Sequence, residues 1–72
     1  MTEREWISKY VDRMVELYRL SPELGRAPSE ARRFAYESAH GAYPALKGQD
    51  PVAVASAEFD EGRSNTSFLE AY

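Results

Sequence analysis

Cysteine is absent from this chain of 72 residues, and histidine and tryptophan occur only once each. Without thiols the chain can form no disulfide, no thiolate metal site and no cysteine nucleophile. No apolar run is long enough to span a bilayer, and the charged start MTEREW has no apolar stretch behind it that would make a signal peptide. We therefore expect a cytoplasmic protein with no membrane partner.

Residues that hold metals and phosphates are also few or scattered. The four glycines, Gly25, Gly41, Gly48 and Gly62, never cluster into a phosphate-binding loop. The acidic stretch DPVAVASAEFDEG has alanine and valine where a calcium loop needs oxygen ligands. We expect no metal and no cofactor.

His40, in the stretch RRFAYESAHGAYP, is the one candidate for acid–base chemistry. A catalytic imidazole needs a nucleophile and an orienting carboxylate within hydrogen-bond reach, and Glu37 and Ser38 form no such triad on one face of a helix. The spacing places His40 away from the apolar stripe, in the last turn of a helix, where a cation suits the negative end of the helix dipole. We predict a surface or capping histidine, and a protein that is not an enzyme.

The length allows one domain, residues 1–72, near the lower limit for a chain that folds alone. The net charge of −3 is unevenly distributed, since residues 1–47 carry +1 and residues 48–72 carry −4. A skew of this kind concerns the choice of partner more than the fold.

The stretch TEREWISKYVDRMVELYRL predicts a helix over residues 3–20. Thr2 and Glu5 have the spacing of a capping box, which satisfies the free amides of a helix start. Eight apolar side chains cover about half of the helix circumference, so more than one helix is needed to cover the stripe. They are Trp6, Ile7, Tyr10, Val11, Met14, Val15, Leu17 and Tyr18.

Two more helices are predicted over residues 28–42 and 51–61, each opened by a proline. A single helical turn at 22–24, ended by Gly25, precedes the first of them. We expect Gly41 and Pro44 to end the second helix and Gly62 to end the third. The fold class is all-α, a compact three-helix domain with a short helical or extended C-terminal tail.

The inner faces of these two helices follow from helical spacing, although the alternation in VAVA is also compatible with a short strand in the third segment. The residues expected to face inward are Ala31, Phe34, Ala35, Ser38 and Ala42 in the second helix, and Val52, Ala55 and Phe59 in the third.

Direct binding of nucleic acid is not expected. A helix-turn-helix protein needs a recognition helix rich in Arg, Lys, Asn and Gln and a positive face. The best candidates are Arg26, Arg32 and Arg33, but the isoelectric point is about 5.0. We read these arginines as solvated helix charges and keep a DNA-binding regulator as a minor alternative.

The acidic last third of the chain suggests that the protein could take the place of a nucleic acid and not bind one. An acidic face can occupy a basic groove in place of a phosphate backbone. The residues predicted to form it are Asp50, Glu58, Asp60, Glu61 and Glu70. The alternative is a solvated surface that keeps a small protein monomeric.

Aromatic residues exceed what a core of this size can enclose completely, so some should remain partly exposed. Exposed Trp and Tyr side chains are natural anchors at protein interfaces. We predict Trp6, Tyr10 and Tyr72 as the anchors of a binding surface.

The chain resembles small helical proteins encoded by bacteriophages and prophages, including the anti-CRISPR proteins. The segments EWISKYVDRMVELYRL and SAEFDEGRSNTSFLEAY, in a short, acidic, cysteine-free chain, carry this resemblance of type. It implies inhibition by binding, in which the protein blocks a nucleic-acid groove or a protein surface on a host complex.

Two classes of function follow from these observations. The first is a non-catalytic inhibitor that covers a basic, nucleic-acid-binding surface of a host protein complex. The second is a small helical regulatory or accessory module, a subunit or a homodimer in which a second copy completes the stripe of the first helix. The chain would act as a monomer or a homodimer.

Overall fold

The computed structural model describes the backbone of residues 1–70 and the side chains of residues 1–62. Three α-helices and one short 3₁₀ turn follow one another along the chain: α1 (Glu3–Arg19), η1 (Pro22–Leu24), α2 (Pro28–Leu46) and α3 (Pro51–Glu70). No strand forms within residues 1–70, so the VAVA segment is helical. The prediction of an all-α protein with three helices is confirmed.

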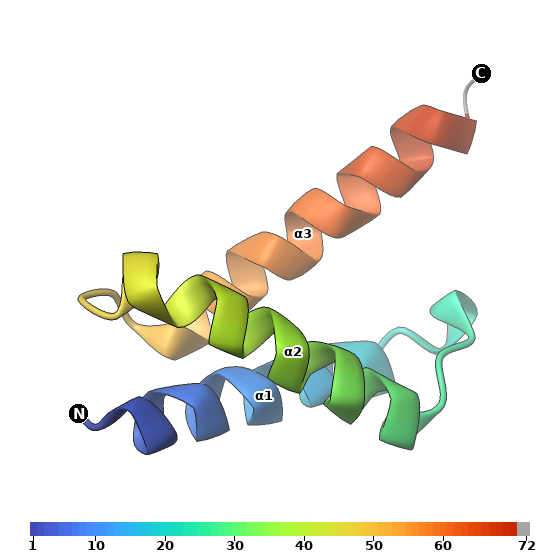
Figure 1. The fold of residues 1–72 in the computed structure, drawn as a ribbon. Coiled ribbons are helices and arrows are strands. Elements are labelled where there is room, and N and C mark those ends of the chain that lie inside the picture. Colours follow the sequence, from blue (N-terminus) through green and yellow to red (C-terminus); the bar gives the residue numbers. More distant parts are fainter. Residues whose placement is uncertain (71–72) are drawn as a thin grey trace.

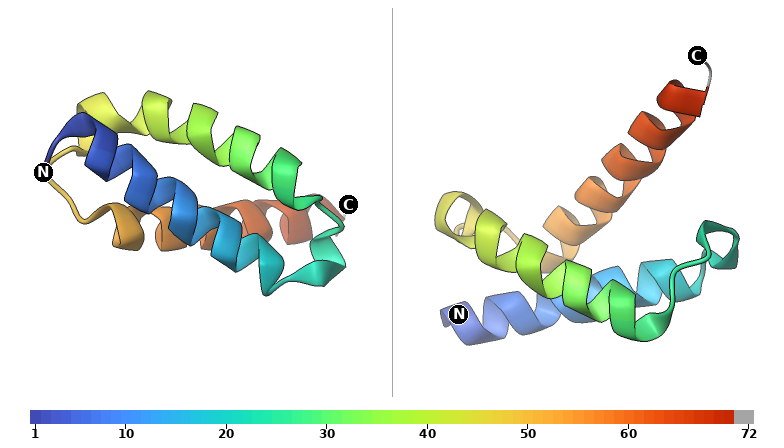
Figure 2. Two further views of the ribbon diagram at one scale, coloured as in Figure 1. Left: turned by 90° about the horizontal axis from the view of Figure 1, so that it is seen from below. Right: turned by 45° about the vertical axis from the view of Figure 1, so that its right-hand side comes forward.

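Helix α1 is the centre of the fold. Helix α2 runs back along α1, and the first half of α3 crosses α1 on another side (Figure 1; Figure 2). Helices α2 and α3 both pack on α1 but scarcely contact each other. The second half of α3 rises away from the α1–α2 pair (Figure 1), and the longest dimension of the molecule is 40 Å.

The start and the buried face of α1 agree with the sequence pattern. The Thr2 hydroxyl accepts a hydrogen bond from the Glu5 amide at 3.1 Å and donates one to the Glu5 carboxylate at 3.3 Å. The apolar stripe is buried or half-buried along its whole length, because α2 and α3 together cover it. A stripe half a circumference wide does need two helices, and this chain supplies both.

The single tryptophan joins all three helices. Trp6 stacks on Tyr10 with ring centroids 5.6 Å apart, and it meets Tyr43 of α2 edge-on at 5.5 Å. Its indole N–H donates a hydrogen bond of 3.0 Å to the carbonyl of Gln49, in the connector that leads to α3. The position of α3 relative to α1 is fixed partly by this contact.

Helix α2 differs from the prediction at its C-terminal end, because it continues through Gly41 and Pro44 to Leu46. Proline lacks the amide that would bond the carbonyl four residues earlier, yet only one such bond is lost this near the helix end. Packing compensates for that loss, since Tyr43 lies against Trp6 and Leu46 lies against the core. Tertiary contacts therefore override the local stop signal.

The inner face of α2 is narrower than predicted. Ala31, Ala35 and Ala39 are buried, whereas Phe34 is 41 % exposed. The large side chains of α1 already fill the space between the two helices, so α2 meets them with small residues, and Phe34 is displaced to the edge. The expectation that Phe34 faces inward is wrong.

Helix α3 begins as predicted but ends later. The Asp50 carboxylate accepts a hydrogen bond from the Val52 amide at 3.0 Å, and Pro51 occupies the first helical position. The helix then continues past Gly62 to Glu70, because one glycine costs a helix only about 1 kcal/mol and no proline follows it. Val54, rather than the predicted Val52, joins Ala55 and Phe59 in the core.

Candidate interaction surface

The surroundings of His40 are those of a surface residue. Because α2 runs on to Leu46, His40 lies in the middle of the helix and not in the last turn, so its predicted place at the helix end is wrong. The imidazole is exposed and packs edge-on against the Tyr36 ring at 4.7 Å. Both rings line a groove between α1 and α2, of about 370 Å³, that also contacts Ile7 and Val11.

The residues predicted to form an acidic face are not equivalent in the structure. Asp50 caps the start of α3. Glu58 is half-buried and accepts a hydrogen bond from the Tyr10 hydroxyl across the α1–α3 contact. Asp60 and Glu61 are exposed and directly follow Phe59, a buried core residue of α3. The side chain of Glu70 lies outside the described residues.

The Tyr10–Glu58 hydrogen bond lies in the interior of the fold and was not foreseen. Tyr10 is fully buried, and this burial, together with the hydrogen bond and the negative charge of Glu58, raises the pKa of the phenol far above its ordinary value of 10.0. Helical spacing did hold a signal, because Glu58 follows the buried Val54 and Ala55 by four and three residues and so shares their face. Glu58 is therefore a structural residue.

Removal of the Tyr10 hydroxyl should lower stability by about 1.5–3 kcal/mol, the usual range for a hydrogen bond to a charged group. We expect Tyr10→Phe to show this loss in urea titrations at neutral pH. Glu58→Gln keeps an acceptor for the hydroxyl and should lose less. Equal stability of Tyr10→Phe and the original protein would contradict the structural role of this bond.

The same pair predicts a specific alkaline response. The pKa of Tyr10 is higher in the folded than in the unfolded chain, so folding favours the neutral phenol. This contribution is complete below pH 10 and is lost as the pH rises above 10, by about 1.4 kcal/mol per pH unit. Above pH 10, the free energy of unfolding should fall more steeply for the original protein than for Tyr10→Phe.

The predicted aromatic anchors are not on the surface. Trp6 and Tyr10 are 1 % and 0 % exposed, so they cannot contact a partner while the fold is intact, and the expectation that they are partly exposed is wrong. Tyr72 lies outside the described residues. Among the side chains of residues 1–62, the large apolar ones that are exposed are instead Met1, Leu20, Leu24, Phe34, Tyr36 and Val52.

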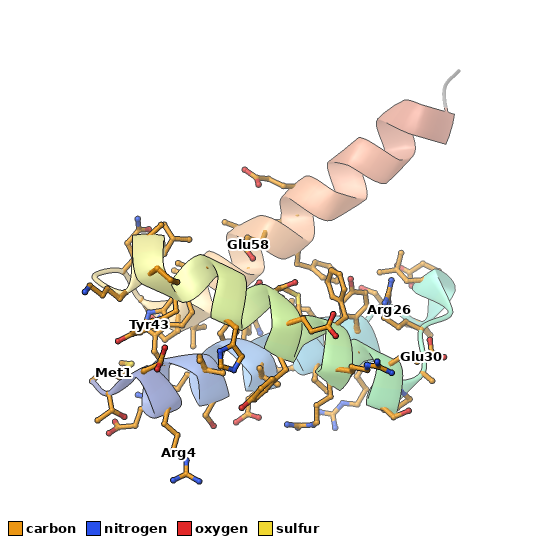
Figure 3. All side chains as sticks on the ribbon, viewed as in Figure 1. Met1, Arg4, Arg26, Glu30, Tyr43 and Glu58 are labelled. Carbon is orange, nitrogen blue, oxygen red and sulfur yellow. The ribbon has the colours of Figure 1, made fainter. Side chains whose placement is uncertain are left out.

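Part of this exposed apolar surface lines a wedge-shaped opening, here called the α3 cleft. It lies where α3 diverges from α1, η1 and the start of α2, and its volume is about 340 Å³. The Arg26 guanidinium lies 5.2 Å from the centre of the Tyr18 ring and 4.9 Å from that of Phe34, so that a cation and two aromatic rings form one wall. Figure 3 labels Arg26, beside η1, and Glu58, on α3. The residues of the α3 cleft are Met14, Tyr18, Leu24, Arg26, Phe34, Glu58, Phe59 and Gly62.

The arginines at the start of α2 are close to acidic side chains. Arg32 lies 3.6 Å from the Asp12 carboxylate of α1, and Arg33 lies 3.8 Å from that of Glu37. All four side chains are well exposed, so these pairs add little stability, but they reduce the local positive charge.

Within residues 1–62, no three His, Asp or Glu side chains lie close enough together to hold a metal ion. None of the helices within residues 1–70 has the length and apolar character needed to cross a bilayer.

No protein-family model, no curated protein and no solved structure matches this chain.

Proposed function

We propose that this protein is a non-catalytic binding protein, an inhibitor of the anti-CRISPR type, that blocks a basic, nucleic-acid-binding surface of a host protein complex. One observation supports the proposal: the second half of α3 rises away from the α1–α2 pair (Figure 1), and Asp60 and Glu61, both exposed, lie at the base of this projecting half. A helix about 10–12 Å across is slender enough to enter a groove shaped for nucleic acid.

The charge distribution supports this use of α3. Residues 48–72 carry a net charge of −4, and opposite charge on a partner steers association over a range set by the Debye length. Asp60 and Glu61 are the described residues of the acidic face that are free of a structural task, since Asp50 caps α3 and Glu58 binds Tyr10. We retain Glu70 as a predicted contact from the sequence.

Two observations weaken the alternatives. The stripe of α1 is covered by α2 and α3 of the same chain, so a regulatory dimer is not needed to complete it. Arg32 and Arg33, which suggested a DNA-binding regulator, lie beside Asp12 and Glu37.

Charge reversal on α3 tests the proposal. We expect Asp60→Lys/Glu61→Lys to weaken binding to the host protein at least about tenfold, equivalent to 1.4 kcal/mol. The matched control is Glu30→Lys/Glu37→Lys, which changes the net charge equally at exposed positions of α2. The host protein would first be captured from a nuclease-treated bacterial lysate on the immobilised original chain. The affinity of this host protein for each variant would then be measured.

The loss of binding must depend on which residues are changed and not only on the net charge. Duplex DNA should compete with the original protein for the captured protein, and the affinity should fall as salt is added, because exposed charges are screened. Equal loss in both double variants would indicate a general charge effect. That outcome, or a failure of DNA to compete, would contradict the proposal.

A further inference from the structure

The direction of the projecting half of α3 depends on the contact between α3 and α1, because α3 scarcely contacts α2 (Figures 1 and 2). Val54, Ala55 and Phe59 form the apolar part of this contact. Burial of apolar surface is non-directional, and the crossing angles of packed helices scatter by about 15–20° around their preferred values. Hydrogen bonds require a defined distance and angle, so the polar part of the contact can fix the direction more closely.

Arg13 forms a polar bridge between the two helices. Its Nε donates a hydrogen bond of 3.0 Å to the Ser56 hydroxyl of α3, and its Nη1 pairs with the Glu16 carboxylate on α1. The Ser56 hydroxyl in turn donates a bond of 3.0 Å to the carbonyl of Val52, one turn earlier in α3. Both side chains are therefore held at a second point on their own helix, and the bond between them joins two fixed positions.

The Arg13–Ser56 bond acts together with the Tyr10–Glu58 bond. Tyr10 and Arg13 are three residues apart and share one face of α1. Ser56 and Glu58 are two residues apart, which places them about 160° apart around the axis of α3. Bonds from one face of α1 to two sides of α3 oppose rotation of α3 about its own axis.

We propose that Arg13 is a positioning residue: its bond to Ser56 sets the angle at which α3 leaves α1, and thereby the direction of the acidic side chains farther along α3. Asp60 and Glu61 follow Ser56 within about one and a half helical turns, so rotation of α3 redirects both. The end of the helix at Glu70 lies about 21 Å beyond Ser56, so a tilt of about 15° displaces it by about 5 Å.

The importance of this angle for binding rests on the proposed function, whereas the angle itself is measured on the purified chain alone. Residual dipolar couplings of the backbone amides report the angles between the helices. Arg13→Lys keeps the net charge, but an ammonium group cannot reproduce the planar fork that joins Glu16 to Ser56. We expect it to shift the α1–α3 angle by on the order of 15°, the scatter that packing allows, and to leave the α1–α2 angle unchanged.

Arg19→Lys is the matched control, because it makes the same change at an exposed position of α1 and should leave both angles unchanged. Ser56→Ala removes the acceptor and should shift the α1–α3 angle as Arg13→Lys does. The double variant should add little, because both substitutions remove the same bond. Circular dichroism must show that each variant keeps its helical content. An α1–α3 angle that is unchanged in Arg13→Lys and Ser56→Ala, or that Arg19→Lys shifts equally, would overturn the proposal.

The affinity of the captured host protein provides a second measurement. It should fall about three- to tenfold for Arg13→Lys, on the scale of one hydrogen bond, and stay within about twofold for Arg19→Lys. An unchanged affinity in a variant with a shifted angle would overturn the role of Arg13 in binding. If Asp60→Lys/Glu61→Lys binds the host protein as well as the original chain does, the proposed function fails, and the helix angle still decides whether Arg13 positions α3.

Discussion

Trp6→Ala is expected to cost about 3–5 kcal/mol of stability, the range for truncating a large buried aromatic side chain. The residue is 1 % exposed, packs against two tyrosine rings and anchors the connector at Gln49. A domain of this length has a total stability of roughly 4–11 kcal/mol. The variant should therefore be partly or wholly unfolded at physiological temperature, which far-ultraviolet circular dichroism with a urea titration will measure.

Trp6→Phe is the control for this experiment. It keeps an apolar ring against Tyr10 and Tyr43 but removes the indole N–H, leaving the carbonyl of Gln49, an exposed residue, to bind water. We expect a loss well below that of the alanine variant. A loss of less than about 1 kcal/mol for Trp6→Ala would mean that Trp6 is not central to the core.

The sequence pattern was most informative for α1, because a helix with a wide apolar stripe and a capping box satisfies two independent local rules. The number of helices and the starts of α2 and α3 also followed from local signals, since Pro28 and Pro51 each occupy a first helical position. These features depend only on neighbouring residues.

Features that depend on distant residues were missed. Trp6 and Tyr10 were expected to be partly exposed, but the end of α2, the connector and α3 close over them. The extension of α2 past Pro44 has the same origin, because Tyr43 and Leu46 are held by residues of the core. Local stop signals are weak preferences, and packing energy of a few kcal/mol exceeds them.

Surface features that depend on residues distant in the sequence were missed for the same reason. Net charge identified the acidic third of the chain, but it could not separate Asp60 and Glu61, which are exposed, from Glu58, which is bonded to a buried tyrosine. The α3 cleft was invisible from sequence because it depends on the angle at which α3 leaves α1. Within residues 1–62, Leu24 and Phe34 are consequently part of the exposed apolar surface, whereas the predicted anchors Trp6 and Tyr10 are buried.

The close approach of α2 to α1 provides the second large prediction. Ala35 and Ala39 are fully buried and lie one helical turn apart, so their methyl groups form the part of α2 that meets the large side chains of α1. Overpacking a well-filled core costs about 1–3 kcal/mol per site and sometimes more. We expect Ala35→Leu/Ala39→Leu to lose about 2–6 kcal/mol in urea titrations, although leucine is nearly as good a helix former as alanine.

Ala45→Leu is the matched control, because Ala45 is an exposed residue of the same helix and the change in side chain is identical. Its stability should stay within about 0.5 kcal/mol of the original protein. Since helix propensity acts equally at both places, a difference between the variants measures the tightness of the α1–α2 contact. If the double variant were as stable as Ala45→Leu, α1 and α2 would have to lie farther apart than the burial of Ala35 and Ala39 requires. The α3 cleft would then have a different shape as well.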